Sequence, residues 1–320
     1  MFAQIDAPLK SQYDSIITLD ANRRDELVAD FFTKNKHHSD QLELALCYHE
    51  YSKKMFRNDI DKAITYAKQA ITIRSKYQDI SAASKSLYAL GHYYNVKGNY
   101  PKSIQTYSRI VDFSKENNLT AKVHNRKGVM FTLIGDFDKA KVNFEKAERY
   151  FKKEAKTKLL YKNHIDIAQM YEKMHWIGEE RMYHIDQADS IQNLIEISDL
   201  GRLILYQISG NFYDERQEYH KAIDYHKKAL SISYRIQDSS YISMNYSNLG
   251  MSYCSLNNFE EAKKSYDKAL LYSGNNTVIK APVYNNLGDY YLAKCQFKKA
   301  LFYYYKAIQY EEIGDVEDKN

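Results

Sequence analysis

Small and aromatic residues recur at fixed distances along most of the chain. In the best-preserved copies of the pattern, a glycine is followed by aromatic residues three and nine positions later and usually by another at sixteen, with small or aliphatic residues at twelve and nineteen. Successive copies, including degenerate ones that start at Tyr51 and Ala168, lie 37 to 42 residues apart, which marks an internal repeat. Five copies keep the glycine itself, at Gly91, Gly128, Gly210, Gly250 and Gly288.

The distances within one copy predict two helices. Positions 0 and 3 lie on one face of a first helix, and positions 12, 16 and 19 lie on one face of a second. Small residues at 0, 12 and 19 let the two helices approach closely, and the aromatic residues fill the space beside them. The copies align without gaps, so we expect every pair to keep the same frame. Position 12 is alanine in four of the five glycine copies, at Ala140, Ala222, Ala262 and Ala300.

The repeats account for most of the chain. Residues 1–43 are expected to cap the first pair. One or two helices are predicted over 11–36, with Asp20 or Asn22 as the N-cap of the stretch that follows it. Pro101 falls in the first turn of a second helix, and Pro282 is expected to open a first helix, positions that tolerate proline. We predict helical pairs over residues 44–80, 84–117, 121–156, 161–198, 203–238, 243–274 and 281–313.

The C-terminal end of the repeats lacks a predicted cap. Residues 314–320 are expected to form an acidic stub with no further helix. Repeat arrays normally finish with a polar-faced cap, and without one Phe302 and Tyr305 would meet water. We therefore expect either that the parent chain continues or that this end self-associates.

Composition excludes several classes of protein. The 320 residues contain only 11 glycines and 3 prolines, too few for the turns of a β-sandwich or barrel. No run of about 18 apolar residues occurs, so we expect no membrane span. The net charge is +5 and basic residues are interspersed with acidic ones, which argues against nucleic-acid binding. Three scattered cysteines without CxxC spacing predict free thiols.

This pattern resembles the tetratricopeptide repeat, a helix-turn-helix unit of about 34 residues. The likeness extends over residues 44–313, although the copies here are longer and lack the proline that often closes a unit. The resemblance implies an all-α, right-handed superhelical solenoid of about seven pairs, in which each pair covers its neighbour's apolar face. Extended units of this kind occur in bacterial peptide-sensing regulators and in the sensor regions of histidine kinases linked to such repeats.

The same resemblance implies that the first helices line a concave groove. Positions six and three before the repeat glycine and one after it share a face, because they are spaced by three and four residues. Amides and hydroxyls there suit the backbone of an extended peptide, and the N-terminal lysines favour an acidic one; a merely hydrated face is the alternative. The candidate ligand-binding residues are Lys85, Tyr88, His92, Lys122, Asn125, Lys162, Gln169, Gln207, Asn211, Ser247, Asn285 and Asp289.

Motifs for catalysis or cofactors are not found. The sequence lacks the phosphate-loop, dinucleotide, zinc-protease, hydrolase-elbow and calcium-loop patterns, so we expect no enzyme, cofactor or metal. His37 and His38 are expected in a solvated loop, and His226, at position 16, is expected in the core. Asn248 and Asn286 are expected to be structural.

The central copy departs most from the pattern. In the ungapped frame, Glu180, His184 and Gln187 replace the alanine, aromatic and alanine of its second helix, and the only tryptophan, Trp176, stands beside its turn. Because a charged Glu180 is costly to bury, this helix is expected to pack loosely and act as a hinge. A harmless variant of the regular pair is the alternative.

These observations favour non-catalytic recognition of a peptide or protein segment. We expect the sensory part of a bacterial signalling protein, such as a histidine kinase linked to the repeats, whose output follows a ligand-induced change. The alternatives are a cytoplasmic peptide-responsive regulator that acts by protein contact, a passive assembly scaffold, and an enzyme with a hidden groove site. Phe2, Ala3 and Gln4 resemble a signal-cleavage stub, which implies the periplasm for a sensor domain; otherwise the cytoplasm is expected.

Overall fold

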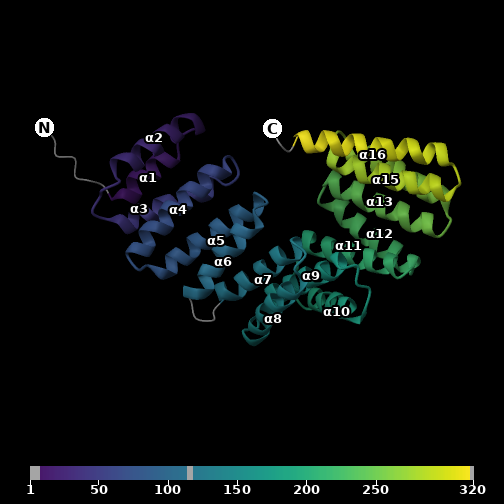
Figure 1. Ribbon diagram of the computed structural model, residues 1–320, viewed down its shortest axis with the longest axis horizontal. Helices are drawn as coiled ribbons and strands as arrows, with labels where there is room; N and C mark the ends of the chain where they lie inside the picture. The colour runs from purple at the N-terminus through teal and green to yellow at the C-terminus, as the bar shows by residue number, and fades with distance from the viewer. Residues whose placement is uncertain (1–7, 114–117, 318–320) are drawn as a thin grey trace. The chain divides into compact units, whose positions relative to one another are not determined.

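The computed structural model describes residues 8–113 and 118–317, which form α-helices and short turns without a strand (Figure 1). Among the described helices, none is long and apolar enough to cross a membrane. The helices are α1 Leu9–Ile17, α2 Ala21–Lys34, α3 Gln41–Met55, α4 Ile60–Lys76, α5 Ile80–Val96, α6 Tyr100–Phe113, α7 Asn118–Leu133, α8 Phe137–Lys153, α9 Thr157–Lys173, α10 Glu179–Leu194, α11 Asp199–Glu215, α12 Tyr219–Arg235, α13 Ser239–Ser255, α14 Phe259–Ser273, α15 Thr277–Ala293 and α16 Phe297–Glu317.

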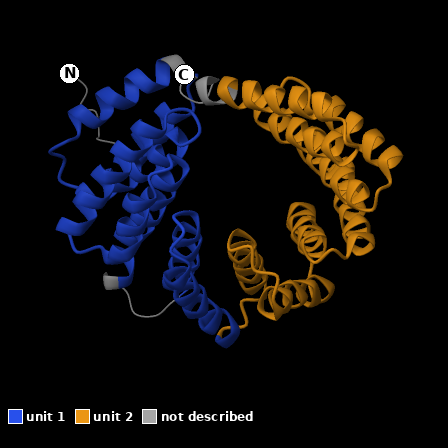
Figure 2. Ribbon diagram, turned by 45° about the vertical axis from the view of Figure 1, so that its right-hand side comes forward, with its two compact units in different colours: residues 1–153 blue, residues 154–320 orange. Residues whose placement is uncertain are grey.

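The chain divides into two compact units, residues 1–153 with α1 to α8 and residues 154–320 with α9 to α16 (Figure 2). From α3 onward each odd-numbered helix packs against the even-numbered helix that follows it, as the repeat predicts. Each pair begins about one helical turn before the predicted repeat boundary. We call the odd-numbered member of a pair the first helix and the even-numbered member the second helix.

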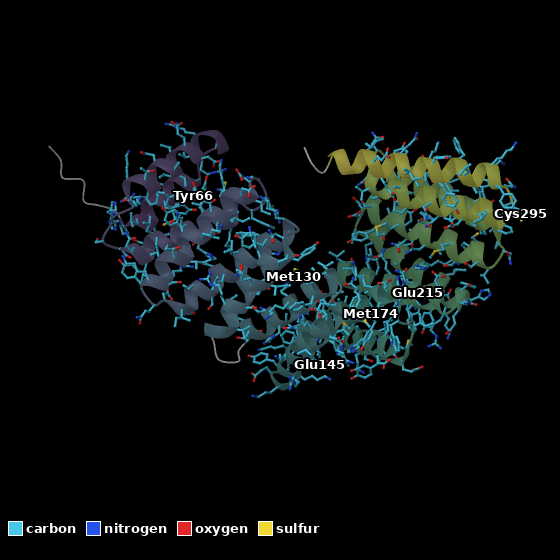
Figure 3. All side chains as sticks on the ribbon, viewed as in Figure 1. Tyr66, Met130, Glu145, Met174, Glu215 and Cys295 are labelled. Atoms are coloured by element: carbon cyan, nitrogen blue, oxygen red, sulfur yellow. The ribbon has the colours of Figure 1, made fainter. Side chains whose placement is uncertain are left out.

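The N-terminal helices continue the core of the first unit. Asp20 starts α2 by accepting a hydrogen bond from the Arg23 amide, the side-chain cap that the sequence predicts. Phe32 of α2 stacks on Tyr48 of α3, with the ring centroids 4.0 Å apart, and lies 5.3 Å from Tyr66 of α4 (Figure 3). These aromatic contacts hold α2 against the first repeat pair.

The repeat glycine receives the ring at position 16 of the same pair. A Cβ built on Gly250 would lie 2.6 Å from Cε1 of Tyr266, closer than side chains pack. The same clash would occur in all five glycine copies, which confirms the predicted close contact. In the first pair, α3 and α4, the large and the small residue are reversed. Tyr51 stands at position 0 and Ala67 at position 16, and both are buried.

The turns within pairs, except the one between α3 and α4, share one backbone conformation. The residue after the first helix's C-cap has positive φ, as in Gly98 (72°), Gln217 (63°) and Cys295 (56°). The next amide then bonds the carbonyl five residues earlier, as Glu218 does to Tyr213 at 2.8 Å, and so closes the helix. Glycine suits this conformation, but several turns use other residues.

Two expectations about helix ends need correction. Pro282 lies inside α15, which begins at Thr277, and does not open the helix. Its ring nitrogen removes one hydrogen bond from an exposed stretch near the helix start, where water can satisfy the freed carbonyl. Residues 314–317 continue α16 as helix, whereas residues 318–320 lie outside the described part. Phe302 and Tyr305 of α16 are exposed, as expected of the last pair.

The central pair, α9 and α10, does not keep the common frame. The turn between them spans residues 174–178, longer than the three-residue turn between α11 and α12. The buried set of α10 consequently shifts by one position, so that Arg181, Ile185 and Ala188 replace the expected Glu180, His184 and Gln187. Glu180 is exposed, so its charge needs no burial in this frame, and the hinge stays a prediction.

Candidate functional site

Polar side chains connect the first helices of the second unit. The Asn211 amide of α11 donates to the Glu172 carboxylate of α9 at 2.7 Å, and the Asn248 amide of α13 donates to the Asn211 oxygen at 3.4 Å. Farther along, the Asn286 amide of α15 donates to the Ser247 hydroxyl at 3.0 Å. We call these five residues the polar ladder. Asn248 and Asn286 thus join neighbouring helices, as the interpretation of both as structural requires.

The predicted ligand-binding positions differ in exposure. Lys85, Gln169, Asn285 and Asp289 are exposed, whereas Asn125 and Ser247 are buried and therefore closed to a ligand in this conformation. The half-buried positions are Tyr88, His92, Lys122, Lys162, Gln207 and Asn211.

Several of these side chains already have protein partners. Gln207 donates to Asn245 at 3.3 Å, and Asp289 accepts a hydrogen bond from the Tyr304 hydroxyl at 2.6 Å. In the first unit, the His92 ring lies 5.0 Å from the Phe56 ring, and burial lowers the pKa of His92. Among the predicted positions of the second unit, the exposed amides are therefore those of Gln169 and Asn285.

A buried arginine stands at the α9 end of the polar ladder. Arg181, which has no exposed surface, lies 2.6 Å from the Glu215 carboxylate and 3.5 Å from that of Glu172. Its guanidinium also covers the Phe212 ring at 5.3 Å. Burial raises the pKa of Glu172, although Asn211 and Arg181 both favour its charged form. The ungapped repeat frame does not predict this cluster, because the longer turn before α10 moves Arg181 to the buried face.

His226 occupies the core position that the repeat predicts. It is fully buried beneath Gly210, and its Nε2 lies 2.8 Å from the Asp214 carboxylate. The Ser252 hydroxyl donates to the other Asp214 oxygen at 2.7 Å. The three residues join α11, α12 and α13. Since the imidazole is sealed from solvent, this chain of hydrogen bonds is structural and presents no nucleophile to a substrate.

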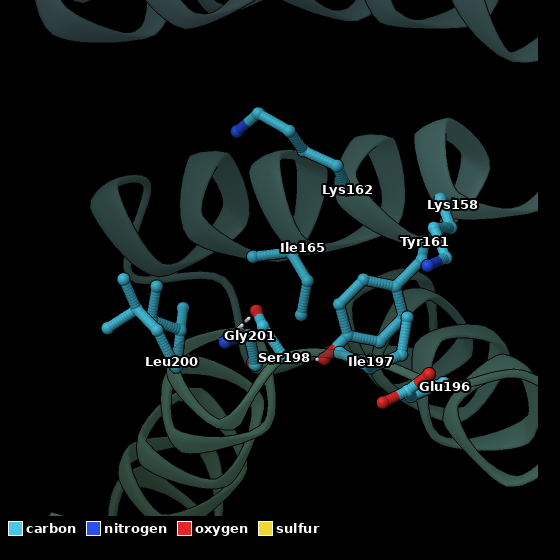
Figure 4. A pocket seen from close by; sticks show the side chains of 10 residues that line it. Lys158, Tyr161, Lys162, Ile165, Glu196, Ile197, Ser198, Leu200 and Gly201 are labelled. Carbon is cyan, nitrogen blue, oxygen red and sulfur yellow. Dashed lines mark hydrogen bonds between the residues drawn. The ribbon is translucent and has the colours of Figure 1, made fainter. Parts of the chain in front are cut away.

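The second unit also contains a pocket between α9 and α11 (Figure 4). Its volume is 370 Å³, within the range of about 300 to 1,000 Å³ that is typical of ligand sites. The Tyr161 hydroxyl donates to the Gly201 carbonyl at 3.0 Å and so fixes the two helices on either side. The lining residues are Lys158, Tyr161, Lys162, Ile165, Glu196, Ile197, Ser198, Leu200, Gly201 and Ile204.

Only part of this pocket was predictable from the repeat. Lys162, Ile165 and Ile204 occupy the predicted first-helix face at positions −6 and −3. Glu196, Ile197 and Ser198 come from the extended connection between α10 and α11, for which the repeat pattern gives no expectation. Apolar side chains here replace the amides found farther along the same face.

The remaining histidines and cysteines singled out in the sequence form no reactive cluster in the described part of the chain. His37 and His38 lie in the connection after α2, as predicted. The cysteines are free, with Cys47 buried and Cys295 exposed (Figure 3). Within residues 8–113 and 118–317, no three His, Cys, Asp or Glu side chains converge as a metal site.

Family comparisons identify the repeat directly. Residues 241–310 match a family model described as tetratricopeptide repeat, and residues 205–239 match a second model of the same description. The chain has the fold of a tetratricopeptide-repeat solenoid. Curated proteins contain no match to its sequence.

Solved structures share this tetratricopeptide-repeat fold at low sequence identity. The apo form of RapI is 15% identical, with a TM-score of 0.73 over 95% of this chain and 84% of that one. The apo quorum sensor NprR from B. thuringiensis is 14% identical, with a TM-score of 0.59 over 95% and 97%. A tetratricopeptide repeat protein from Parabacteroides merdae is 16% identical, with a TM-score of 0.59 over 87% and 98%.

Proposed function

We propose that the first-helix face of the second unit binds an extended peptide or protein segment. The polar ladder carries the proposal, because it fixes asparagine amides on α11, α13 and α15 and a carboxylate on α9. Exposed Gln169 and Asn285 flank the ladder on the same face. An amide side chain both donates and accepts, and therefore matches the alternating groups of a peptide backbone without reading its sequence.

A related fold is known with a peptide. NprR has been solved in complex with its cognate peptide NprX, and that structure is 14% identical to this chain with a TM-score of 0.58 over 92% of it. Our proposal is that this chain uses its repeats in the same general way. Binding would favour one arrangement of the helices over others, since a ligand shifts an equilibrium by its differential affinity for the two states.

We further propose that this recognition has a signalling output. A peptide-responsive regulator and the sensor region of a histidine kinase both fit a module that binds without catalysis. The gene encoding this chain distinguishes them: a kinase module in the same reading frame supports the sensor, and a DNA-binding module supports the regulator.

The binding proposal is testable on the intact chain. Random linear 12-residue peptides displayed on phage are selected against immobilised protein, and enriched sequences are then synthesised with a fluorescent label. Gln169→Ala and Asn285→Ala should each weaken binding about fivefold, because one net hydrogen bond contributes about 1 kcal/mol. Gln309→Ala removes an exposed amide from second helix α16 and should leave binding unchanged.

Two outcomes contradict the proposal. One is a selection that enriches no peptide over a scrambled pool. The other is equal affinity of all three variants for the selected peptides, which would move the binding surface away from the first helices.

A further inference from the structure

The pocket between α9 and α11 differs from the rest of the first-helix face in its chemistry. Ile165 and Ile197 form a buried floor, and Leu200 lies on the rim with 45% of its surface exposed (Figure 4). The polar ladder beyond it offers half-buried asparagine amides, whereas this end offers a hollow lined by aliphatic side chains. An apolar group that enters the hollow leaves water and contacts a floor already in place.

The floor is pre-formed by close contacts in the chain. The hydrogen bond from Tyr161 to the Gly201 carbonyl ties α9 to α11. Gly201 itself permits the approach of Ile197, since a Cβ there would lie 2.8 Å from the isoleucine Cγ2. A pocket that is held open in this way does not have to be ordered by its ligand, which favours binding.

Charge around the pocket is asymmetric. Lys158 and Lys162 extend from α9, and Glu196 lies on the opposite element, the connection before α11. Lys162 is 3.1 Å from Asp166, whereas no ion pair of Lys158 is found among the described residues. A ligand carboxylate is therefore attracted to the α9 side and repelled by Glu196. The amino end of α11 at Ser198 adds a weak preference for negative charge.

We propose that this pocket takes one bulky apolar side chain of the bound peptide, with a carboxylate beside it held by Lys158 and Lys162. The inference rests on the proposed function for its peptide, and it adds the class of sequence that is selected. The carboxylate belongs either to the peptide's C-terminus or to an adjacent acidic residue. The polar ladder then accounts for affinity along the backbone, and the pocket accounts for specificity.

Small probes test the pocket without relying on the ladder. The probes are N-acetyl-phenylalanine, its carboxamide, and N-acetylglycine, each titrated into intact protein while the Leu200 methyl and Gly201 amide signals are followed by NMR. N-acetyl-phenylalanine should bind more than tenfold tighter than N-acetylglycine, because only the former buries an aromatic ring. It should bind about two- to fivefold tighter than the carboxamide, a ratio that high salt removes.

Matched variants locate each contribution. Lys158→Gln and Lys162→Gln should each reduce the preference for the carboxylate over the carboxamide. Lys263→Gln is the control, because Lys263 pairs with Asp267 at the same helical spacing as Lys162 with Asp166, but on α14. Leu200→Asp places a charge on the rim and should abolish binding of the phenylalanine probes. That variant should fold, since Leu200 is exposed in the first turn of α11, where acidic residues are favourable.

Peptides then distinguish the two sources of the carboxylate. The hexapeptides are Gly-Ser-Asn-Gly-Ser-Phe as free acid and as amide, and Gly-Ser-Asn-Gly-Phe-Glu as amide. Tighter binding of the free acid than of both amides assigns the C-terminus, and equal binding of the free acid and the glutamate peptide assigns an acidic neighbour. The proposal is overturned if N-acetyl-phenylalanine and N-acetylglycine bind equally, or if the probes bind Leu200→Asp normally. Peptide binding that depends on Asn285 but not on Leu200 would refute the pocket and keep the proposed function.

Discussion

Replacing Gly250 by alanine tests the packing of a repeat pair. The added methyl would lie 2.6 Å from Cε1, 2.7 Å from Cδ1 and 2.8 Å from Cζ of Tyr266. The ring has little room to move, because Tyr266 is 1% exposed and its centroid lies 6.0 Å from that of the Tyr290 ring. We therefore expect Gly250→Ala to destabilise the second unit.

The expected magnitude combines two opposing effects. Alanine is about 1 kcal/mol better than glycine inside a helix. Overpacking a dense core costs about 1–3 kcal/mol. The upper end applies here, because the ring is rigid and the added methyl is fixed to the main chain, so neither group can move aside. The net loss should be about 1–2 kcal/mol.

Removing the ring should reverse the sign. Tyr266→Ala alone should cost about 3–5 kcal/mol through the cavity it creates. In that background Gly250→Ala meets no ring and should stabilise by about 1 kcal/mol, so that the two substitutions are coupled by about 2–3 kcal/mol. Tyr266→Phe keeps the ring and is the control, in which Gly250→Ala should remain destabilising.

Urea unfolding followed by circular dichroism measures the free energies, and hydrogen exchange of α13 and α14 assigns them to this pair. If Gly250→Ala has the same sign and size in the Tyr266→Ala, Tyr266→Phe and unmodified chains, the contact between position 0 and position 16 does not determine the packing.

Three further predictions concern other features. Burial, together with the charge of Arg74, lowers the pKa of His49 to about 4. The first unit should therefore lose stability as the pH falls from about 6.5, the pKa in the unfolded chain, to 4. His49→Gln should reduce this dependence of stability on pH, measured as urea midpoints across that range. Gln217→Gly should relieve a φ of 63° and stabilise the chain by up to about 1 kcal/mol, which raises the thermal midpoint, whereas Gly135→Ala should lower the midpoint. Equal changes of the midpoint in the two variants would show that the positive φ does not determine stability at these turns. Arg181→Ala should cost up to about 3 kcal/mol and speed hydrogen exchange in α10, because Glu172 loses its cation; exposed Glu180→Ala should change stability by less than about 0.5 kcal/mol.

The repeat frame was predictable from the sequence because small and large residues alternate at fixed positions of every copy. Small residues opposite rings require close helix contacts, and the position of His226 in the core followed from the same spacing. The frame failed at Arg181, where a longer turn moves the buried face by one residue. The sequence does contain a signal of this shift. Position 19 is small or aliphatic in every other pair, whereas in the central pair it is Gln187 and the alanine stands one residue later, at Ala188.

The candidate site was less predictable than the fold. Helical spacing placed Lys162, Ile165 and Gln169 on one face, but spacing does not show which of these side chains the neighbouring helix covers. Asn125 and Ser247 have the same periodic position as exposed residues and are nevertheless buried. The far wall of the pocket, from Glu196 to Ser198, lies in an extended connection whose path depends on the helices that it joins.

The exchange of sizes between the first pair and the later pairs has a consequence for assembly. If α3 met the second helix of a later pair, Tyr51 and Tyr266 would compete for one space; if α13 met α4, Gly250 would face Ala67 across a void. Both mismatched hairpins are unfavourable, because the first overpacks two tyrosine rings and the second leaves a cavity between glycine and alanine. The reversed sizes thus discourage pairing of a helix of the first hairpin with a helix of a glycine hairpin, one form of the mispairing to which repetitive proteins are prone during folding. It follows that shuffling of such genes should succeed when the first hairpin is exchanged whole and fail when the joint falls inside it.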